Sequence, residues 1–206
     1  MMKKLMILCV IVFLGAGSIA LAIDVVPPPW RGEPGTTMQQ WEFSVFDFTP
    51  APDVVRNDNG MPGLWANTHG WIQNMDGRQG IWPLSGEIDV YIPNYDRDWP
   101  EKFIWLQLTW KPGDQVNPYL PDEPMIGVVP IPFMVASRTD TLLGLGWTHS
   151  IFEIEMWPNP PVEWIGIKGD ILVDELVIDT YCVPEPATMA LLGLGGLSLL
   201  RTRKRR

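Results

Sequence analysis

The stretch Gly86-Glu87-Ile88-Asp89-Val90-Tyr91-Ile92, followed by Lys102-Phe103-Ile104-Trp105-Leu106-Gln107-Leu108-Thr109-Trp110, decides the fold class. In the first segment apolar and polar side chains alternate, which is the period of a β-strand with one buried face. In the second segment, Ile104 and Leu106 share one face, while Phe103 and Trp105 make the other face apolar as well. A strand that is apolar on both faces is typical of the centre of a sheet. The two segments predict a β protein with a central strand at 102–110.

The rest of the body continues this pattern, because short runs rich in Ile, Val, Trp, Phe and Thr alternate with clusters of Pro, Gly, Asn and Asp. Eight strands are expected, at residues 40–46, 86–92, 102–110, 125–131, 142–147, 151–157, 162–168 and 171–181. The Pro-, Asn- and Asp-rich links 47–62, 95–101 and 111–124 are expected to be loops. The all-β pattern predicts a single β-sandwich, or jelly-roll-like, domain over residues 23–182.

The first 22 residues have the order of a secretory signal peptide. Lys3 and Lys4 precede an apolar core at 5–14, and Ala20 and Ala22 are small residues at the two positions that a signal peptidase recognises. We therefore expect cleavage after Ala22. A retained N-terminal membrane helix is the alternative.

The last residues combine a short motif, an apolar run and a basic end. The motif is Val183, Pro184, Glu185, Pro186 and Ala187; no charged residue occurs from Ala187 to Leu200; and the end carries Arg201, Arg203, Lys204, Arg205 and Arg206. An apolar run followed by a cationic cluster predicts a transmembrane helix whose basic end stays cytoplasmic, with the body on the far side. The run is shorter than the roughly 20 residues of a full span. A temporary anchor and a permanent one are both open.

This tail resembles the PEP-CTERM family of bacterial exported proteins over about the last tenth of the chain, residues 183–206. The resemblance implies sorting by an exosortase, a membrane protease that cuts near the motif and releases or transfers the body to the cell surface or extracellular matrix. The implied partners are the exosortase and, transiently, the inner membrane, in addition to the signal peptidase expected from the N-terminus. An ordinary tail anchor without processing is the alternative.

The segment from Asp24 to Glu185 is strongly acidic, with eight basic and 24 acidic residues and a formal charge of −16. Such a body repels nucleic acid and favours cations or uncharged polymers such as an exopolysaccharide. If Cys9 leaves with the signal peptide, Cys182 remains alone, and no intrachain disulfide can form. Cys182 could pair between chains or be an incidental thiol.

Eleven tryptophans lie between Trp30 and Trp164. An indole can stack on a sugar ring, but core packing is the expected role of most of the eleven. Two strands place aromatic residues beside carboxylates on an outward face, and these are the speculative glycan-binding residues: Glu87, Asp89 and Tyr91 on one strand, Glu153, Glu155 and Trp157 on the other. If both strands lie in one sheet, they form an acidic, aromatic face. A merely solvated face is the alternative.

No cofactor is expected, although a structural calcium ion could find oxygen ligands in two loops, at Asp53, Asn57, Asp58 and Asn59 and at Asp96 and Asp98. The same residues also make turns, and Val55 breaks the EF-hand spacing. No catalytic motif is present, and His149 and Ser150 are strand neighbours that point to opposite faces. The sequence therefore predicts a non-enzymatic exported surface or matrix protein, with an extracellular carbohydrate-binding, lectin-like module as the alternative.

Overall fold

The computed structural model describes residues 26–68, 70–94, 100–114, 117–129 and 133–183, and it contains strands and no helix in these ranges. The strands are β1 (Thr36–Trp41), β2 (Val54–Arg56), β3 (Gly63–Thr68), β4 (Ile72–Met75), β5 (Arg78–Pro93), β6 (Glu101–Pro112), β7 (Met125–Val129), β8 (Phe133–Gly144), β9 (Trp147–Met156) and β10 (Val162–Val183). The predicted all-β class is confirmed.

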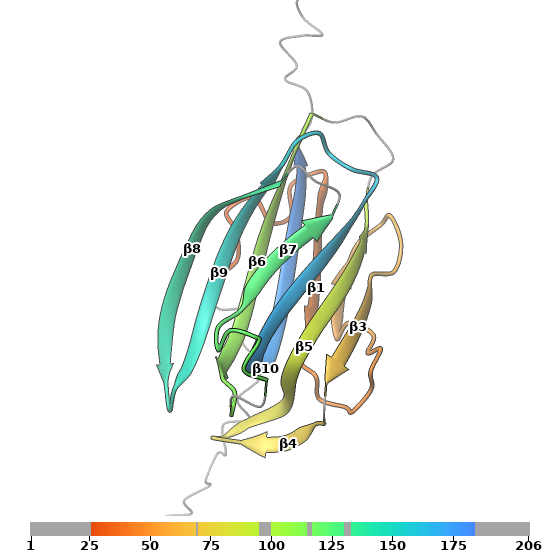
Figure 1. The fold of residues 1–206 in the computed structure, drawn as a ribbon. Helices are drawn as coiled ribbons and strands as arrows, with labels where there is room; N and C mark the ends of the chain where they lie inside the picture. Colours follow the sequence, from red (N-terminus) through yellow and green to blue (C-terminus); the bar gives the residue numbers. More distant parts are fainter. Residues whose placement is uncertain (1–25, 69, 95–99, 115–116, 130–132, 184–206) are drawn as a thin grey trace, which may run out of the picture.

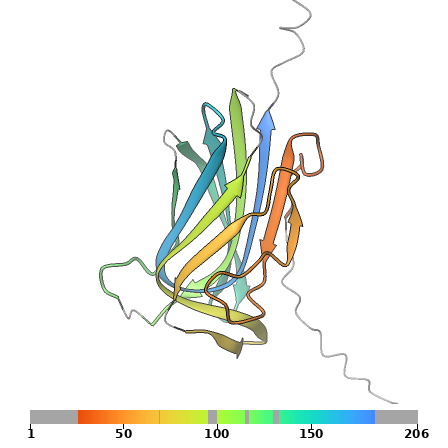
Figure 2. The same cartoon turned by 90° about the vertical axis from the view of Figure 1, so that its right-hand side faces the viewer.

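The strands form two facing layers that share the long strand β10 (Figure 1). The first layer has the order β3-β5-β10-β7 and uses the first half of β10. The second layer has the order β2-β1-β10-β6-β9-β8 and uses the second half of β10. Figure 2 shows the same two layers from the side. The arrangement is consistent with the predicted β-sandwich.

Strand β10 joins the layers because it is hydrogen-bonded on both sides where it bends. Residues 162–173 pair with β5, and residues 171–183 pair with β6, so Ile171 to Val173 have partners in both neighbours. The register with β6 shifts between Val173 and Glu175, which marks a bulge. A bulge bends a strand and increases its twist, which lets β10 cross from one layer to the other.

The core lies between the layers and follows the alternation of the sequence. Ile88, Val90 and Ile92 of β5 are fully buried, and Ile104 and Leu106 of β6 pack against them from the second layer. Burial of each such side chain stabilises the fold by about 1.5–3 kcal/mol. Strand β6 lies between β10 and β9, so the predicted central strand is confirmed.

Two positive-φ glycines near the β4–β5 hairpin have clear reasons. The hairpin turn is Asp76-Gly77, with φ of 54° and 83°, the dipeptide that a tight two-residue turn prefers. Gly80 has φ of 77°, and a Cβ there would lie 2.4 Å from the backbone oxygen of Phe43. Only glycine allows this close approach of β5 to the segment that follows β1.

Several predicted boundaries are wrong. The first strand ends at Trp41 and not at residue 46, and residues 162–168 and 171–181 belong to one strand. Residues 142–147 cover the turn between β8 and β9, while β2, β3, β4 and most of β8 were not expected. Of the expected loops, 47–62 contains the short strand β2.

Candidate functional site

The body ends where the predicted sorting motif begins. Val183 is the last residue of β10 and pairs with Glu101 at the start of β6. Pro184, Glu185, Pro186 and Ala187 lie outside the described residues, as do the predicted cleavage residues Ala20 and Ala22 and the basic residues Arg201, Arg203, Lys204, Arg205 and Arg206. No helix within the described ranges is long and apolar enough to cross a membrane.

The two predicted carboxylate-and-aromatic sets do not form one face. Glu87, Asp89 and Tyr91 lie on β5 in the first layer, whereas Glu153 and Glu155 lie on β9 in the second. Because the layers face each other across the core, the two sets look outward on opposite sides of the sandwich. Each set therefore lies beside a different group of aromatic side chains.

On the first layer, Tyr91 belongs to a cluster that we call the aromatic face, made of Trp65, Tyr91 and Trp164. The ring centroids of Trp164 lie 5.4 Å from Trp65 and 5.1 Å from Tyr91. An adjoining hollow contains Glu87 and Asp89. Burial raises the pKa of Asp89, and the nearby Glu87 adds to this rise. Lys168 Nζ lies 3.2 Å from Glu87 Oε2, so part of the acidity is locally neutralised.

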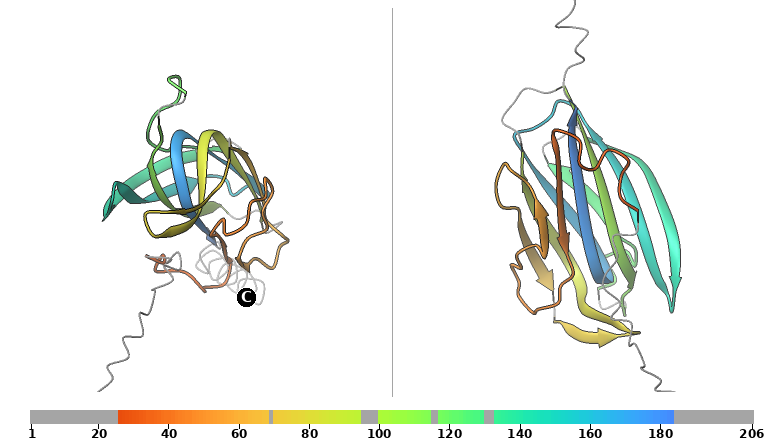
Figure 3. Two further views of the ribbon diagram at one scale, coloured as in Figure 1. Left: turned by 90° about the horizontal axis from the view of Figure 1, so that it is seen from below. Right: turned by 180° about the vertical axis from the view of Figure 1, so that it is seen from behind.

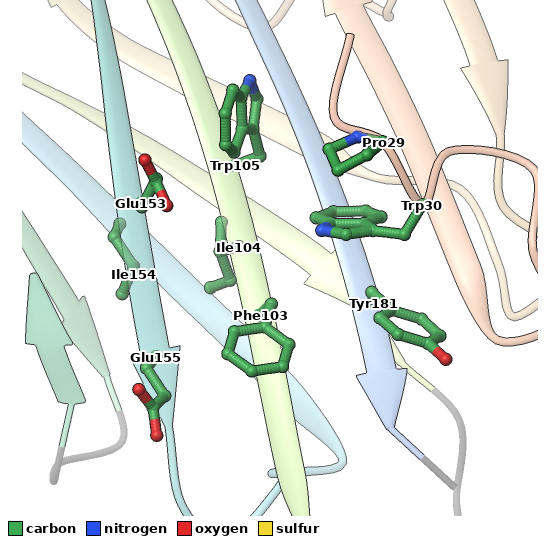
Figure 4. A pocket seen from close by; sticks show the side chains of 9 residues that line it. All are labelled: Pro29, Trp30, Phe103, Ile104, Trp105, Glu153, Ile154, Glu155 and Tyr181. Carbon is green, nitrogen blue, oxygen red and sulfur yellow. The ribbon is translucent and has the colours of Figure 1, made fainter. Parts of the chain in front are cut away.

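On the second layer, Glu153 and Glu155 line a hollow of about 320 Å³ that we call the trough. Its aromatic side chains come from three segments: Phe103 and Trp105 from β6, Tyr181 from β10, and Trp30 from the segment before β1. Figure 4 shows Trp30 between Trp105 and Tyr181, with the two carboxylates on the neighbouring strand. Trp157 does not line the trough and is 67% exposed beyond the end of β9.

Carboxylates crowd the β9 side of the trough. Ser137 Oγ donates a hydrogen bond of 2.7 Å to Glu153 Oε1. At the other end, burial and a hydrogen bond with Glu155 raise the pKa of Glu101. Glu153 and Glu155 of β9 thus lie across from the aromatic rings of β6, with Glu101 of β6 beside Glu155, and this arrangement favours a ligand with hydrogen-bond donors or positive charge.

The segment before β1 crosses the outer face of the second layer and is anchored there (Figure 3, right). Arg31 forms a bidentate pair with the fully buried Asp179, with Nε–Oδ1 and Nη2–Oδ2 distances of 2.6 and 2.5 Å. Trp105 Nε1 donates to the carbonyl oxygen of Val26 at 3.1 Å. The rings of Trp30 and Tyr181 stack with centroids 5.5 Å apart. These contacts hold the trough in shape without a ligand.

The end of the core near Val183 contains polar and charged side chains that are buried. Lys102 and Glu163 form an ion pair in which both side chains are fully buried. Cys182 is also fully buried, and its Sγ donates to Asn94 Oδ1 at 2.9 Å. The thiol is therefore not accessible for pairing between chains in the folded body.

In the candidate calcium loop, side-chain oxygens already accept hydrogen bonds from the protein backbone. Asp53 Oδ2 accepts a hydrogen bond from the backbone of Glu42, and Asn57 Oδ1 accepts one from the backbone of Asn59. Asp96 and Asp98 lie outside the described residues. Within the described ranges, no group of three or more His, Cys, Asp or Glu side chains could hold a metal ion.

His149 and Ser150 have separate partners. Thr109 Oγ1 lies 3.1 Å from His149 Nδ1, and burial, followed by the charge of Arg78, lowers the pKa of this histidine. Ser150 Oγ donates to Asp140 and accepts from the indole of Trp110. His69 lies outside the described residues.

Sequence reasoning missed four trough residues and overestimated the buried tryptophans. Trp41, Trp82, Trp110 and Trp147 are buried, but the other six tryptophans in the described ranges are at least partly exposed. The alternation at 102–110 puts Phe103 and Trp105 on the same face, but a second apolar face also fits a buried central strand, so the sequence does not show that this face is open. Trp30 and Tyr181 reach the trough through tertiary packing, for which the sequence has no local signal.

The comparisons with known proteins give a match in the tail of the chain. Residues 183–206 match the family model of the PEP-CTERM protein-sorting motif. No curated protein and no solved structure matches the chain. The match begins at Val183, which is also the last residue of β10, so the matched segment starts where the last strand ends. The chain therefore carries a PEP-CTERM protein-sorting motif at its C-terminus.

Proposed function

We propose that this chain is a non-enzymatic surface or extracellular-matrix protein that is exported by its signal peptide and then processed at its tail by an exosortase. The match of residues 183–206 to the protein-sorting motif carries this proposal. The motif starts where the last strand ends, so a cut within or after it would leave every strand pair of β10 intact.

The chemistry of the body supports a role outside the cytoplasm. The segment from Asp24 to Glu185 has a formal charge of −16, and such self-repulsion keeps an exported protein soluble. Cys182 is buried, so an oxidising compartment has no accessible thiol to modify in the described body. The fold depends on its core and on buried ion pairs.

The sorting proposal is tested by replacing Pro184, Glu185 and Pro186 with alanine in the native bacterium. We expect the variant to accumulate in the membrane fraction, while the wild-type body appears at the surface or in the medium. Tyr119→Ala is the control, because this loop side chain is 93% exposed and lies far from the motif in sequence. Release of the alanine variant at the wild-type rate would overturn the proposed processing.

Glycan binding by the body is the second candidate function. The observation that favours it is the pairing of partly exposed aromatic rings with carboxylates on both outer faces. Aromatic rings offer flat apolar surfaces, and carboxylates accept hydrogen bonds from hydroxyl groups. A protein retained at the surface by such contacts would be linked to the matrix without a covalent bond.

A further inference from the structure

The trough repeats one pair of groups along the strand direction. Trp105 lies directly across from Glu153, and Phe103 lies directly across from Glu155. Residues two apart on a strand project from the same face at a spacing of roughly 7 Å. The trough therefore presents two successive aromatic-and-carboxylate pairs, an arrangement that suits a ligand with a repeating unit better than a single small molecule.

The charges of the trough restrict the ligand further. Glu153 and Glu155 lie on one side, and Glu101 hydrogen-bonds with Glu155 at its end. No basic side chain lines the hollow within the described residues. An anionic chain would be repelled, whereas hydroxyl or ammonium groups would find acceptors. Charge complementarity thus favours a neutral or amine-bearing chain.

The walls are fixed before any ligand binds. The bidentate contact of Arg31 with the buried Asp179 anchors the segment that carries Trp30, and Tyr181 supports the Trp30 ring. The indole NH of Trp105 is already engaged by Val26. A preformed site loses less conformational entropy on binding than a flexible one.

We propose that the trough binds a glycan chain without acidic groups, placing one pyranose ring at the Trp105–Glu153 pair and the next at the Phe103–Glu155 pair. The apolar face of each ring packs against the aromatic side chain, with Trp30 forming the wall on the β10 side. Hydroxyl or ammonium groups donate to the carboxylates. The inference rests on glycan binding, the second candidate function, and does not depend on how the tail is processed.

The test is calorimetric titration of the purified full-length protein in a detergent without a sugar headgroup. The probes are cellobiose, cellohexaose, a chitosan hexamer and a hexagalacturonate. We expect the neutral or the amine-bearing hexamer to bind, the disaccharide to bind at least about tenfold more weakly, and the uronate not to bind. Cellohexaose and the chitosan hexamer separate hydroxyl recognition from ammonium recognition, and Glu153→Gln should weaken the chitosan hexamer more.

Matched variants locate the site. Trp105→Ala and Trp30→Ala should each weaken binding roughly tenfold, the equivalent of about 1.4 kcal/mol. Trp157→Ala should leave affinity unchanged, because this exposed ring lies outside the trough. Glu153→Gln keeps the side-chain shape and guards against a loss that arises only from misfolding.

Two results would overturn the inference. If Trp164→Ala abolishes binding and Trp105→Ala does not, glycans bind the aromatic face; glycan binding then stands as a function, but the trough is not its site. If no neutral or amine-bearing chain binds, or if the uronate binds best, both the inference and the second candidate function fail. In either case the sorting proposal is untouched.

Discussion

Replacing Lys102 with methionine removes the cation from a buried pair and leaves the carboxyl group of Glu163 in the core. Both side chains of the pair are fully buried in the wild type. Breaking a buried pair by removing one partner costs about 3–5 kcal/mol, because an uncompensated charge stays behind. We expect Lys102→Met to lower the free energy of unfolding by an amount in this range at pH 7.

The size of this loss should depend on pH. Burial raises the pKa of Glu163, while the charge and hydrogen bond of Lys102 lower it, so removing Lys102 raises this pKa further. An acid whose pKa is higher in the folded state stabilises the fold below its unfolded pKa of about 4.3 and loses that stabilisation as pH rises toward the folded value. The penalty should be smallest at pH 4 and should grow by up to about 1.4 kcal/mol per pH unit once the pH exceeds the folded pKa of Glu163 in the wild type, which burial has already raised.

The assay is urea denaturation of the full-length protein in neutral detergent, followed by the fluorescence of its buried tryptophans. The control is Lys102→Met combined with Glu163→Leu, since an apolar pair of similar volume often replaces a buried ion pair at little cost. The double variant should recover most of the loss at pH 7. A single variant that loses less than about 1 kcal/mol at pH 7, or a loss that is the same at pH 4 and at pH 8, would refute the reasoning.

Three further predictions use the same denaturation assay. Burial, followed by repulsion from nearby carboxylates, raises the pKa of Glu175 to about 7. The free energy of unfolding of Glu175→Gln should therefore match that of the wild type near pH 4 and exceed it by up to roughly 3 kcal/mol at pH 8. A difference that does not change with pH would contradict this. Gly80→Ala should lower the free energy of unfolding more than Gly77→Ala does. Both glycines have positive φ, but only a Cβ at residue 80 would clash with backbone atoms, so equal losses would contradict this. Arg31→Met should cost about 3 kcal/mol by stranding buried Asp179, and Arg31→Lys less; unchanged unfolding midpoints would argue against this anchor.

Strand periodicity predicted the parts of the fold in which one face is buried. The alternation at 86–92 gives the correct inward face, since Ile88 is in the core while Glu87 faces outward, and the doubly apolar run at 102–110 gives the correct central position, between β10 and β9. Side-chain alternation on a strand is a local property, so the sequence contains it.

Other elements depend on pairing that no local pattern shows. Gly169-Asp170 separates two of the expected strands, 162–168 and 171–181, yet β10 continues through it because β5 pairs with it there and β6 joins at the next residue. Strand β8 carries Arg138 and Asp140, and charged residues suit an edge strand, which among the described strands pairs with β9 alone. Pairing with strands distant in the sequence decides these positions.

The candidate site was predictable only in part. Glu153 and Glu155 were correctly assigned to an outward face with aromatic residues, but the rings beside them come from β6, β10 and the segment that carries Trp30. Glu87 and Asp89 belong to the opposite layer because β10 divides its partners between the two layers. A sequence pattern identifies which face a residue occupies and not which faces come together.

The most direct test of the sorting proposal is intact-mass spectrometry of the native protein from membrane, surface and medium. The account predicts a chain outside the membrane that begins at Ile23 and ends near Pro186. A chain found solely in the membrane and still ending at Arg206 would contradict exosortase processing and make the protein a plain tail-anchored envelope protein.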